Sequence, residues 1–310
     1  MQRRSILLAA GAATLGSSLL AACGGGSNDP DIVQLAQSNP DLSILVEAVV
    51  AAGLVDTLKG RGPFTVFAPT NAAFASLLTE LGVTKDALLA NKNLLTTVLT
   101  YHVLPGRVDK ASVPVGKAIT TVEGSIFKID TSSGALAITD GRNRVANIVQ
   151  TDINAFNGVV HVIDKVVLPA NKNIVETALG IPDFSILVEA VVAANLQGTL
   201  SGKGPFTVFA PTNAAFAALL AELGVTKAAL LANVPLLTAV LTYHVVSGRV
   251  LKADVPVGAP ITTVQGGTFV IDSTLAITDA RGRKSKIVAT DVLTSNGVIH
   301  VVDKVILPAA

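Results

Sequence analysis

The sequence predicts an α+β fold that occurs twice in tandem. Two observations support this prediction. The 310-residue chain repeats itself over most of its length, and within each copy helical patterns come first and β patterns follow. A run of helices followed by a run of strands is typical of α+β domains, in which the strands pair with one another instead of alternating with helices.

The repeat has a constant spacing over most of each copy. The stretch GPFTVFAPTNAAFA occurs at residues 62–75 and again, letter for letter, at residues 204–217, which lie 142 residues later. The same offset relates DLSILVEAVVAAGL at Asp41 to DFSILVEAVVAANL at Asp183. Internal periodicity on this scale is a stronger guide to organisation than local propensity.

The offset falls to 139 residues within the β part. IDTSSGALAITD at Ile129 corresponds to the shorter IDSTLAITD at Ile271. A deletion inside a strand would move its side chains to the opposite face, whereas a loop tolerates a change of length. Residues 130–136 are therefore predicted to form a loop.

Each copy is about 140 residues long, which is near the common size of a globular domain and much longer than a solenoid repeat. Two autonomous domains are therefore predicted, each with its own hydrophobic core. The predicted boundaries are residues 31–169 for domain 1, residues 170–172 for a short linker and residues 173–310 for domain 2.

Apolar spacing predicts the elements of each copy. Residues 41–55 carry apolar side chains on one helical face. FTVFA at residues 64–68 is a short apolar run that ends at a proline, which indicates a strand, and Thr70 or Asn71 is expected to cap the next helix. That helix is predicted to end at Gly82, and two more helices follow. The remainder is predicted to be β, with Gly, Asn and Asp turns between ITTV, SIFKID, ALAIT, RVANIV and GVVHVIDKVVL.

Residues 1–22 are predicted to be an export signal. Two arginines precede an apolar run of small residues that is too short and too often interrupted by glycine to be a membrane span. The sequence LAAC at residues 20–23 resembles a bacterial lipobox, in which Cys23 is lipidated and becomes the mature N-terminus. The arginine pair also resembles a twin-arginine signal, so the export route stays open.

Residues 23–30 are predicted to form a lipidated, flexible tether. Acyl chains on Cys23 would anchor the protein to a bacterial membrane, facing the periplasm or the cell exterior. Cys23 is the only cysteine, so the mature domains are predicted to contain no disulfides. Removal of the signal takes away two of the 23 basic residues and none of the 22 acidic ones, which leaves a formal charge of −1 and no electrostatic case for nucleic-acid binding.

Three motifs occur in the same order in both copies. They are FTVFAPTNAAF, TYHVLPGRV and NGVVHVIDKVVLP in the first copy, and FTVFAPTNAAF, TYHVVSGRV and NGVIHVVDKVILP in the second. Together they resemble the two signatures and the central Tyr-His element of the fasciclin (FAS1) domain, over nearly the whole mature chain. The resemblance implies a wedge-shaped β-sandwich flanked by helices in each domain.

The resemblance also implies a function, namely non-enzymatic adhesion or matrix binding at the cell surface. The expected partners are cell-surface or extracellular matrix proteins or polymers, and the membrane itself through the lipid anchor. A carrier of an apolar small molecule such as a carotenoid is the alternative, and a weak hydrolase is the third and least favoured hypothesis.

No motif for catalysis or metal binding occurs in the sequence. The four histidines form two equivalent pairs, since His244 repeats His102 and His300 repeats His161. Residues three apart on a strand point to opposite faces, so His161 and Asp164 are not expected to pair as a base and its orienting acid. The chain contains no HExxH, no Cys-His cluster and no Gly-x-Ser-x-Gly, so no enzymatic activity, metal or cofactor is predicted.

The Tyr-His pairs are the candidate binding residues. The resemblance places an adhesive element at Tyr101 and His102, and again at Tyr243 and His244. In the alternative interpretation each pair is structural and locks the helices to the sheet by hydrogen bonds. The helical spacing favours the structural interpretation for His102, which continues an apolar stripe, and both interpretations stay open.

Overall fold

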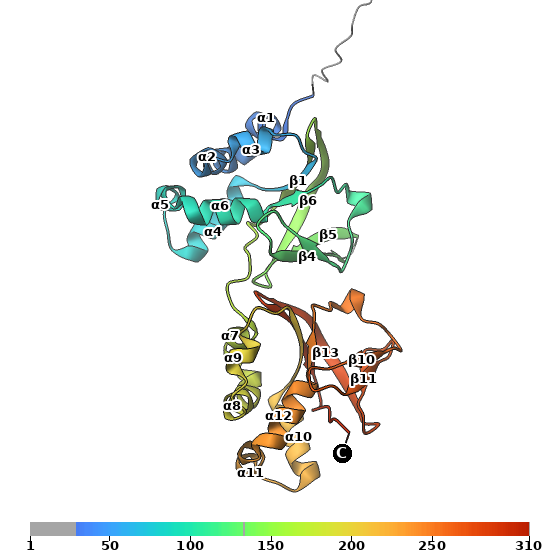
Figure 1. Cartoon of the computed structure of the whole chain (residues 1–310). Helices are drawn as coiled ribbons and strands as arrows, with labels where there is room; N and C mark the ends of the chain where they lie inside the picture. The colour runs from blue at the N-terminus through green and yellow to red at the C-terminus, as the bar shows by residue number, and fades with distance from the viewer. Residues whose placement is uncertain (1–28, 133, 310) are drawn as a thin grey trace, which may run out of the picture.

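The computed structural model describes residues 29–132 and 134–309, which form two domains stacked end to end (Figure 1). Cys23 and the predicted export signal lie outside these residues. In each domain a layer of helices covers one side of a curved sheet, and both helical layers lie on the same side of the molecule (Figure 1). None of the helices within the described ranges combines the length and the apolar character needed to span a bilayer.

The two domains contain equivalent helices. In domain 1 they are α1 (Ile32–Ser38), η1 (Pro40–Leu42), α2 (Ser43–Ala52), α3 (Val55–Lys59), α4 (Asn71–Leu81), α5 (Lys85–Ala90), α6 (Lys92–Tyr101) and η2 (Lys110–Ser112). In domain 2 they are α7 (Ile174–Leu179), η3 (Pro182–Phe184), α8 (Ser185–Ala193), α9 (Gln197–Leu200), α10 (Asn213–Leu223), α11 (Lys227–Ala232), α12 (Val234–Tyr243) and η4 (Lys252–Asp254).

Each domain has a seven-stranded sheet with the same topology. Domain 1 contains β1 (Phe64–Pro69), β2 (Val103–Pro105), β3 (Ala118–Thr120), β4 (Ile126–Ser132), β5 (Ala135–Thr139), β6 (Val145–Ala155) and β7 (Gly158–Ile163), in the order β2-β1-β7-β6-β5-β4-β3. Domain 2 contains β8 (Phe206–Pro211), β9 (Val245–Ser247), β10 (Pro260–Thr262), β11 (Thr268–Ile271), β12 (Ala276–Thr278), β13 (Lys284–Thr294) and β14 (Gly297–Val302), in the equivalent order.

The first and last strands of a domain lie side by side and parallel. β1 runs along β7, with Phe64 opposite Gly158 and Pro69 opposite Ile163, whereas the other strand pairs of the domain are antiparallel. A Cβ at Gly158 would lie 2.1 Å from the carbonyl oxygen of Phe64, so this close approach requires glycine. The preceding Asn157 donates to the carbonyl of Leu58 at 2.7 Å. The Asn-Gly pair therefore joins the helical segment to the sheet.

One long strand in each domain belongs to both halves of the sheet. β6 pairs with β5 through its first residues and with β7 through its last, and its register against β7 shifts twice between Ile148 and Ile153. Shifts of this kind bend a strand. Asp152 lies in the shifted part and has a left-handed φ of 60°. The bend lets the seven-stranded sheet curve until it is nearly closed. The helices pack against this sheet, which confirms the predicted α+β fold class.

Each domain has two hydrophobic cores. Leu45 and Phe74 belong to the core between helices and sheet. Phe67, Tyr101 and Phe127 belong to the second core, inside the curved sheet, where the Phe127 ring meets the other two edge to face at centroid distances of 5.3 and 5.8 Å. Such pairs contribute about 1 kcal/mol beyond their buried area. Domain 2 repeats both cores with equivalent residues.

Adjacent residues of the repeated motif cap two different helices. The hydroxyl of Thr70 accepts from the N–H of Ala73 at 3.2 Å and caps α4. The side chain of Asn71 reaches α2 instead, where its Oδ1 accepts from the N–H of Ile44 at 2.9 Å and its Nδ2 donates to the carbonyl of Pro40 at 3.0 Å. The stretch APTN therefore ties two helices to the end of β1.

Two predicted boundaries are wrong. Residues 130–136 are not a loop, since β4 extends to Ser132 and β5 begins at Ala135. The shorter copy has shorter strands in this hairpin, because both arms of a hairpin can lose residues without a change of register elsewhere. The helix predicted over residues 41–55 is interrupted by Gly53, whose φ of 72° ends α2 before α3 begins.

Substitution Asn71→Ala should lower the free energy of unfolding by about 3 kcal/mol, because three hydrogen bonds of roughly 1 kcal/mol each are lost, with Ile44, Pro40 and Ser43. The matched substitution Asn213→Ala removes the bonds with Ile186, Pro182 and Ser185 in domain 2 and should have the same effect. Thr70→Ala removes one cap bond and should cost about 1 kcal/mol. Urea unfolding measures these losses, and equal losses for Asn71→Ala and Thr70→Ala would contradict the two-helix role.

Candidate functional site

Tyr101 ends α6 and places its ring inside the sheet core. Its side chain is fully buried. The hydroxyl donates to the carbonyl of Ile126 at 2.7 Å and accepts from the N–H of Gly141 at 2.8 Å, which joins β4 to the turn after β5. Burial, and to a lesser degree the nearby Asp140, raises the pKa of the phenol far above its usual value. The hydroxyl therefore remains a proton donor to the sheet.

His102 follows α6 directly and faces the helical core. Its Nδ1 lies 2.7 Å from the carbonyl oxygen of Val98, and its Nε2 lies 3.1 Å from the backbone N of Val167. Because a backbone N–H only donates, Nε2 accepts and Nδ1–H donates, which defines a neutral imidazole. Burial lowers the pKa of His102 to about 4, so the ring is uncharged near neutral pH.

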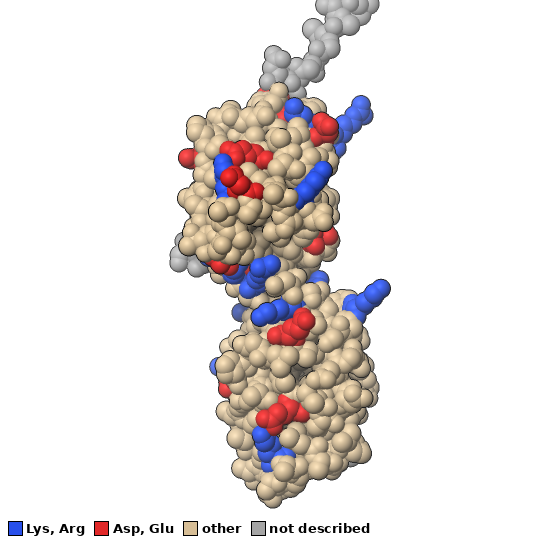
Figure 2. All heavy atoms as spheres, turned by 90° about the vertical axis from the view of Figure 1, so that its left-hand side faces the viewer, with Lys and Arg blue, Asp and Glu red and all other residues tan. Residues whose placement is uncertain are grey.

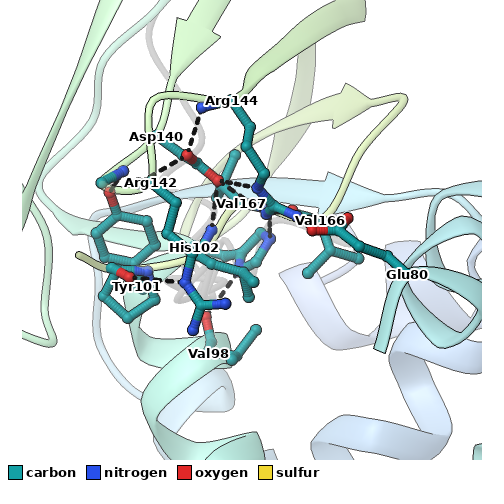
Figure 3. Close-up of polar contacts among 12 residues, drawn as sticks. Glu80, Val98, Tyr101, His102, Asp140, Arg142, Arg144, Val166 and Val167 are labelled. Carbon is teal, nitrogen blue, oxygen red and sulfur yellow. Dashed lines mark hydrogen bonds and ion pairs between the residues drawn. The ribbon is translucent and has the colours of Figure 1, made fainter. Parts of the chain in front are cut away.

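A buried carboxylate lies next to this pair (Figure 3). One oxygen of Asp140 accepts from the backbone N–H groups of Arg142 and Arg144, both at 2.9 Å. Its other oxygen accepts from the N–H of Leu168 at 2.9 Å and from Nη2 of Arg144 at 2.8 Å. The carboxylate therefore holds its own turn and the segment that closes the domain.

The guanidinium of Arg144 connects this carboxylate to a helix. Nη2 also donates to the carbonyl of Val166 at 2.7 Å, and Nη1 contacts both carboxylate oxygens of Glu80 on α4 at 2.8 and 3.0 Å (Figure 3). The closing segment, residues 166–168, is thus held from three sides. We call Tyr101, His102, Asp140 and Arg144 the Tyr-His clamp.

Domain 2 contains the same clamp, formed by Tyr243, His244, Asp279 and Arg283. The Tyr243 hydroxyl donates to the carbonyl of Thr268 at 2.6 Å, and Nε2 of His244 accepts from the N–H of Ile306 at 3.1 Å. Burial lowers the pKa of His244 to about 4, as it does for its counterpart. The arrangement is therefore a property of the domain and not of one copy.

The four residues predicted as binding candidates are all buried. Tyr101 and Tyr243 are 0% exposed, and His102 and His244 are 2% exposed. Their polar atoms are occupied by backbone partners, so direct contact with a partner would require the domain to open. A contact role stays a prediction, whereas the clamp describes what these side chains do inside the fold.

Two clamp residues in each domain were missed from the sequence. Asp140 and Arg144 are four residues apart in TDGRNR, and the same spacing recurs in TDARGR of the second copy. A short turn with one acidic and several basic residues is usually a solvated turn, so only its repetition could have drawn attention to it. The partner of Asp140 in the closing segment, Leu168, lies 28 residues further along the chain, and no local sequence pattern reveals this contact.

The second histidine pair also contacts the backbone. Nδ1 of His161 accepts from the N–H of Asp152 at 3.2 Å, and its Nε2 lies 2.9 Å from the carbonyl oxygen of Val108. Asp164 binds Asn147 instead of His161, at 2.7 Å. Within the described residues no group of three or more His, Cys, Asp or Glu side chains could hold a metal ion.

Each domain has a small apolar cavity between its helices and its sheet. In domain 1, Leu45, Val49 and His102 line the cavity, and the equivalent Leu187, Val191 and His244 line the one in domain 2. Each has a volume of about 30 Å³. A volume of this size holds only a few water-sized groups, about one for every 10–15 Å³.

Substitution Tyr101→Phe should lower the free energy of unfolding by about 1–3 kcal/mol, because the N–H of Gly141 and the carbonyl of Ile126 lose a buried partner. The matched substitution Tyr243→Phe should have a similar effect in domain 2. Denaturant unfolding of the full chain measures both. An unchanged stability in either variant would show that the hydroxyl does not support the clamp.

The stability of the protein should fall in mild acid. The pKa values of His102 and His244 are lowered to about 4 from an ordinary value of 6.5, so the unfolded chain binds protons more readily than the folded one. The free energy of unfolding should therefore be level above about pH 6.5 and decrease toward pH 4, by roughly 3 kcal/mol for each histidine.

Unfolding curves measured between pH 4 and pH 7 test this expectation. The double variant His102→Asn, His244→Asn should have a shallower pH dependence over the same range, whatever its stability at neutral pH. The same slope in the variant and in the natural protein would refute the assignment to these two rings.

Comparison with known proteins identifies a family and relatives of this chain. The family model described as Fasciclin domain matches residues 40–169 and residues 182–308. Transforming growth factor-beta-induced protein ig-h3 of Sus scrofa is 33% identical over 254 residues, which cover 81% of this chain and 35% of that protein. Protein sll1483 of Synechocystis sp. is 44% identical over 142 residues, which cover 44% of this chain and 73% of that protein. The chain thus spans about a third of the length of the porcine relative.

One solved structure also matches this chain. It is described as a FAS1 domain pair from the insect cell adhesion molecule Fasciclin I, and the match covers 87% of this chain and 98% of that chain, with 18% identity and a TM-score of 0.44. The two regions matched by the family model fall one in each repeat and together cover most of the sequence. The chain therefore belongs to the fasciclin family and contains two tandem Fasciclin domains.

Proposed function

We propose that the protein is an exported, lipid-anchored adhesion protein that binds cell-surface or extracellular matrix proteins or polymers through its two fasciclin domains. Membership in a family of adhesion and matrix-binding modules supports this function. The side chains that could have suggested catalysis, namely the four histidines, are engaged with backbone groups inside the fold.

The observation that carries the proposal is that the two domains expose the same apolar positions. On α2 and α8, Val50 and Val192 are 58% and 50% exposed. Further equivalent exposed pairs are Leu81 and Leu223, Val83 and Val225, Val115 and Val257, Val122 and Val264, and Val149 and Val288. A single exposed valine is unremarkable, but the duplicated set gives both domains the same exposed apolar positions.

The presence of the same exposed apolar positions in both domains favours bivalent binding. The helical layers lie on the same side of the molecule, so α2 and α8 are presented in the same general direction (Figure 1). A partner with a repeating structure can then contact both domains, and the second contact forms at a raised effective concentration.

The charge on this side of the molecule indicates the chemistry of the partner. Figure 2 shows that most of the helical side carries neither acidic nor basic side chains, and the charges that occur have both signs. Several of them neutralise each other, as Lys85 does with Glu47 and Lys227 with Glu189, both at 2.7 Å. An uncharged polymer or a protein surface fits this face better than a polyanion.

The anchor completes the proposal. In this proposal the residue that is acylated is Cys23 of the LAAC sequence, eight residues before the first helical cap at Asp31. A random coil of this length would reach about 15 Å, enough to hold domain 1 close to a membrane. The carrier function gains no support from the two apolar cavities, since about 30 Å³ is far below the 300–1,000 Å³ of ordinary small-molecule sites.

Cells that display the full chain should adhere to a matrix-coated surface, and adhesion should depend on both domains. Val50→Asp or Val192→Asp alone should weaken adhesion by roughly 100-fold, because one bivalent contact becomes monovalent. The double variant should abolish it. Both positions are exposed, so unchanged unfolding curves serve as the control for folding. Full adhesion of the double variant would exclude this face as the contact surface.

The same cells test the anchor. Cys23→Ser should release the protein into the medium and remove radiolabelled palmitate from it, while its unfolding curve stays the same. Retention of the Cys23→Ser protein in the membrane fraction would contradict lipid anchoring without affecting the adhesion result.

A further inference from the structure

The two domains are joined by specific hydrogen bonds as well as by the linker. Asn143, in the turn between β5 and β6, lies against Leu293 on β13 of the other domain. Its Nδ2 donates to the carbonyl of Leu293 at 3.0 Å, and its Oδ1 accepts from the N–H of the same residue at 2.7 Å. One side chain thus satisfies both backbone groups of a residue 150 positions away.

An ion pair also crosses the junction. Nζ of Lys128 on β4 lies 3.0 Å from a carboxylate oxygen of Asp291 on β13, and 3.0 Å from Asp130 of its own domain. The side chains of Lys128 and Asp291 are 12% and 3% exposed. The other oxygen of Asp291 accepts from the N–H of Lys252 at 2.8 Å, so the buried carboxylate has a partner on each side.

Apolar residues complete the junction. Ile126 of domain 1 packs in one cluster with Leu251, Leu293 and Val298 of domain 2, and all four are buried. Figure 1 shows the end of domain 1 that carries β4 and β5 facing the end of domain 2 where β13 reaches upward. Domain 1 lies above domain 2 in Figure 1. We therefore call Ile126, Lys128 and Asn143, at the lower end of domain 1, the lower face. We call Leu251, Asp291 and Leu293, at the upper end of domain 2, the upper face.

The free end of domain 2 is equivalent to the lower face but lacks its side chains. Thr268, Val270 and Gly282 occupy the positions of Ile126, Lys128 and Asn143 respectively. The turn has the same left-handed backbone in both copies, since Gly282 has a φ of 73° and Asn143 a φ of 61°. The side chains that contact the other domain are therefore replaced at an equivalent turn.

The free end of domain 1 is equivalent to the upper face and is also altered. Asp152 keeps the position of Asp291 and accepts the equivalent bond, from the N–H of Lys110 at the start of η2 at 2.8 Å, but it is exposed. Polar residues, Asp109 and Asn154, replace the two leucines of the upper face. This end is therefore solvated.

The leucines of the upper face replace the two residues that bind an equivalent arginine in domain 1. In domain 1, Arg107 contacts Asp109 at 2.7 Å and also bonds to Asn154. In domain 2, both partners are leucine, and Nε of the equivalent Arg249 is buried with no hydrogen-bond partner among the described residues. Domain 2 thus leaves a guanidinium nitrogen unsatisfied, at a cost in free energy, where the two leucines that replace its partners pack with Ile126 of domain 1.

We infer that the two domains form one rigid unit, in which the lower and upper faces bind only each other, and that the altered free ends prevent the same contact from forming between chains. A head-to-tail contact between equivalent modules does not close on itself, so intact faces at both free ends would assemble chains into filaments. Replacing the contact residues at those ends stops the assembly at two domains.

The rigidity of the two-domain unit should strengthen binding, and this point rests on the proposed function. The distance and orientation between the two helical faces become constant, which lowers the entropic cost of engaging both on one partner. The open cleft beside the junction, about 550 Å³ in volume and lined in part by Arg142 and Lys172, likewise keeps its shape. The inference about the junction itself needs no ligand, so it can fail while adhesion is confirmed, or stand while adhesion is refuted.

Pulsed electron paramagnetic resonance on the full chain tests rigidity. Cys23→Ser removes the only native cysteine, and Ser76→Cys with Ala218→Cys places spin labels at equivalent exposed positions on α4 and α10. The distance distribution should show one narrow peak. Lys128→Val with Asn143→Gly introduces the residues that domain 2 itself has at these positions, and the narrow peak should be lost while each domain stays folded.

The control is Asp152→Ala, which changes the free counterpart of Asp291 and should leave the peak narrow. A broad distribution in the unmodified junction, or an equally narrow one after Lys128→Val with Asn143→Gly, would overturn the inference of a rigid unit.

Transplantation of the two faces tests their specificity. Thr268→Ile, Val270→Lys and Gly282→Asn rebuild the lower face on domain 2, and Asp109→Leu with Asn154→Leu rebuild the upper face on domain 1. Analytical ultracentrifugation of this chain should show concentration-dependent head-to-tail oligomers, whereas the natural chain and a chain rebuilt at one end stay monomeric. Val270→Glu in place of Val270→Lys faces Asp152 with a like charge and should abolish assembly.

Absence of oligomers from the doubly rebuilt chain at roughly 1 mM would show that these residues do not specify docking. Oligomers that persist with Val270→Glu would show non-specific association through the added leucines, and would equally overturn the inference.

Discussion

A buried carboxylate in each domain fixes the positions of the surrounding segments. Asp140 is 1% exposed, and a charge in such a site costs several kcal/mol unless every oxygen is hydrogen-bonded. The partners of Asp140 come from its own turn, from Leu168 in the closing segment and from Arg144. Arg144 also binds Glu80 on α4. Satisfying one carboxylate therefore aligns the sheet, the closing segment and the helical layer, and Tyr101 adds a further bond to the same turn.

The two domains differ in the side chains at the ends where they contact each other. The clamp consists of the same four residue types in both domains, because a change at a fully buried polar site leaves partners unsatisfied. Its Arg-Asp contact is looser in domain 2, where Nη1 of Arg283 lies 3.9 Å from Asp279. At the ends of the domains no such restraint acts, and there the copies have diverged. Asn143 bridges the junction in one copy where Gly282 faces solvent in the other, although both hold the same left-handed backbone.

The motif that best identifies the family has an internal explanation. In APTN, Thr70 caps α4 while Asn71 holds the start of α2, and the Tyr-His element belongs to the clamp. The residues that make the family recognisable are thus buried or engaged in caps, and the surface available to partners consists of less distinctive exposed side chains such as Val50. Sequence similarity consequently reports the fold more directly than the ligand.

The sequence by itself determined the duplication, the α+β class, most helices and strands, and a helix cap at Thr70 or Asn71, because these depend on periodicity and on neighbours within a few residues. For the Tyr-His pairs it left a structural and a binding interpretation open. Only the tertiary structure decided the partners of Asp140, the parallel pairing of β1 with β7 and the contact of Lys128 with Asp291. Those interactions join residues that are 28 to 163 positions apart, and a polar side chain carries no local sign of which distant group will satisfy it once water is excluded.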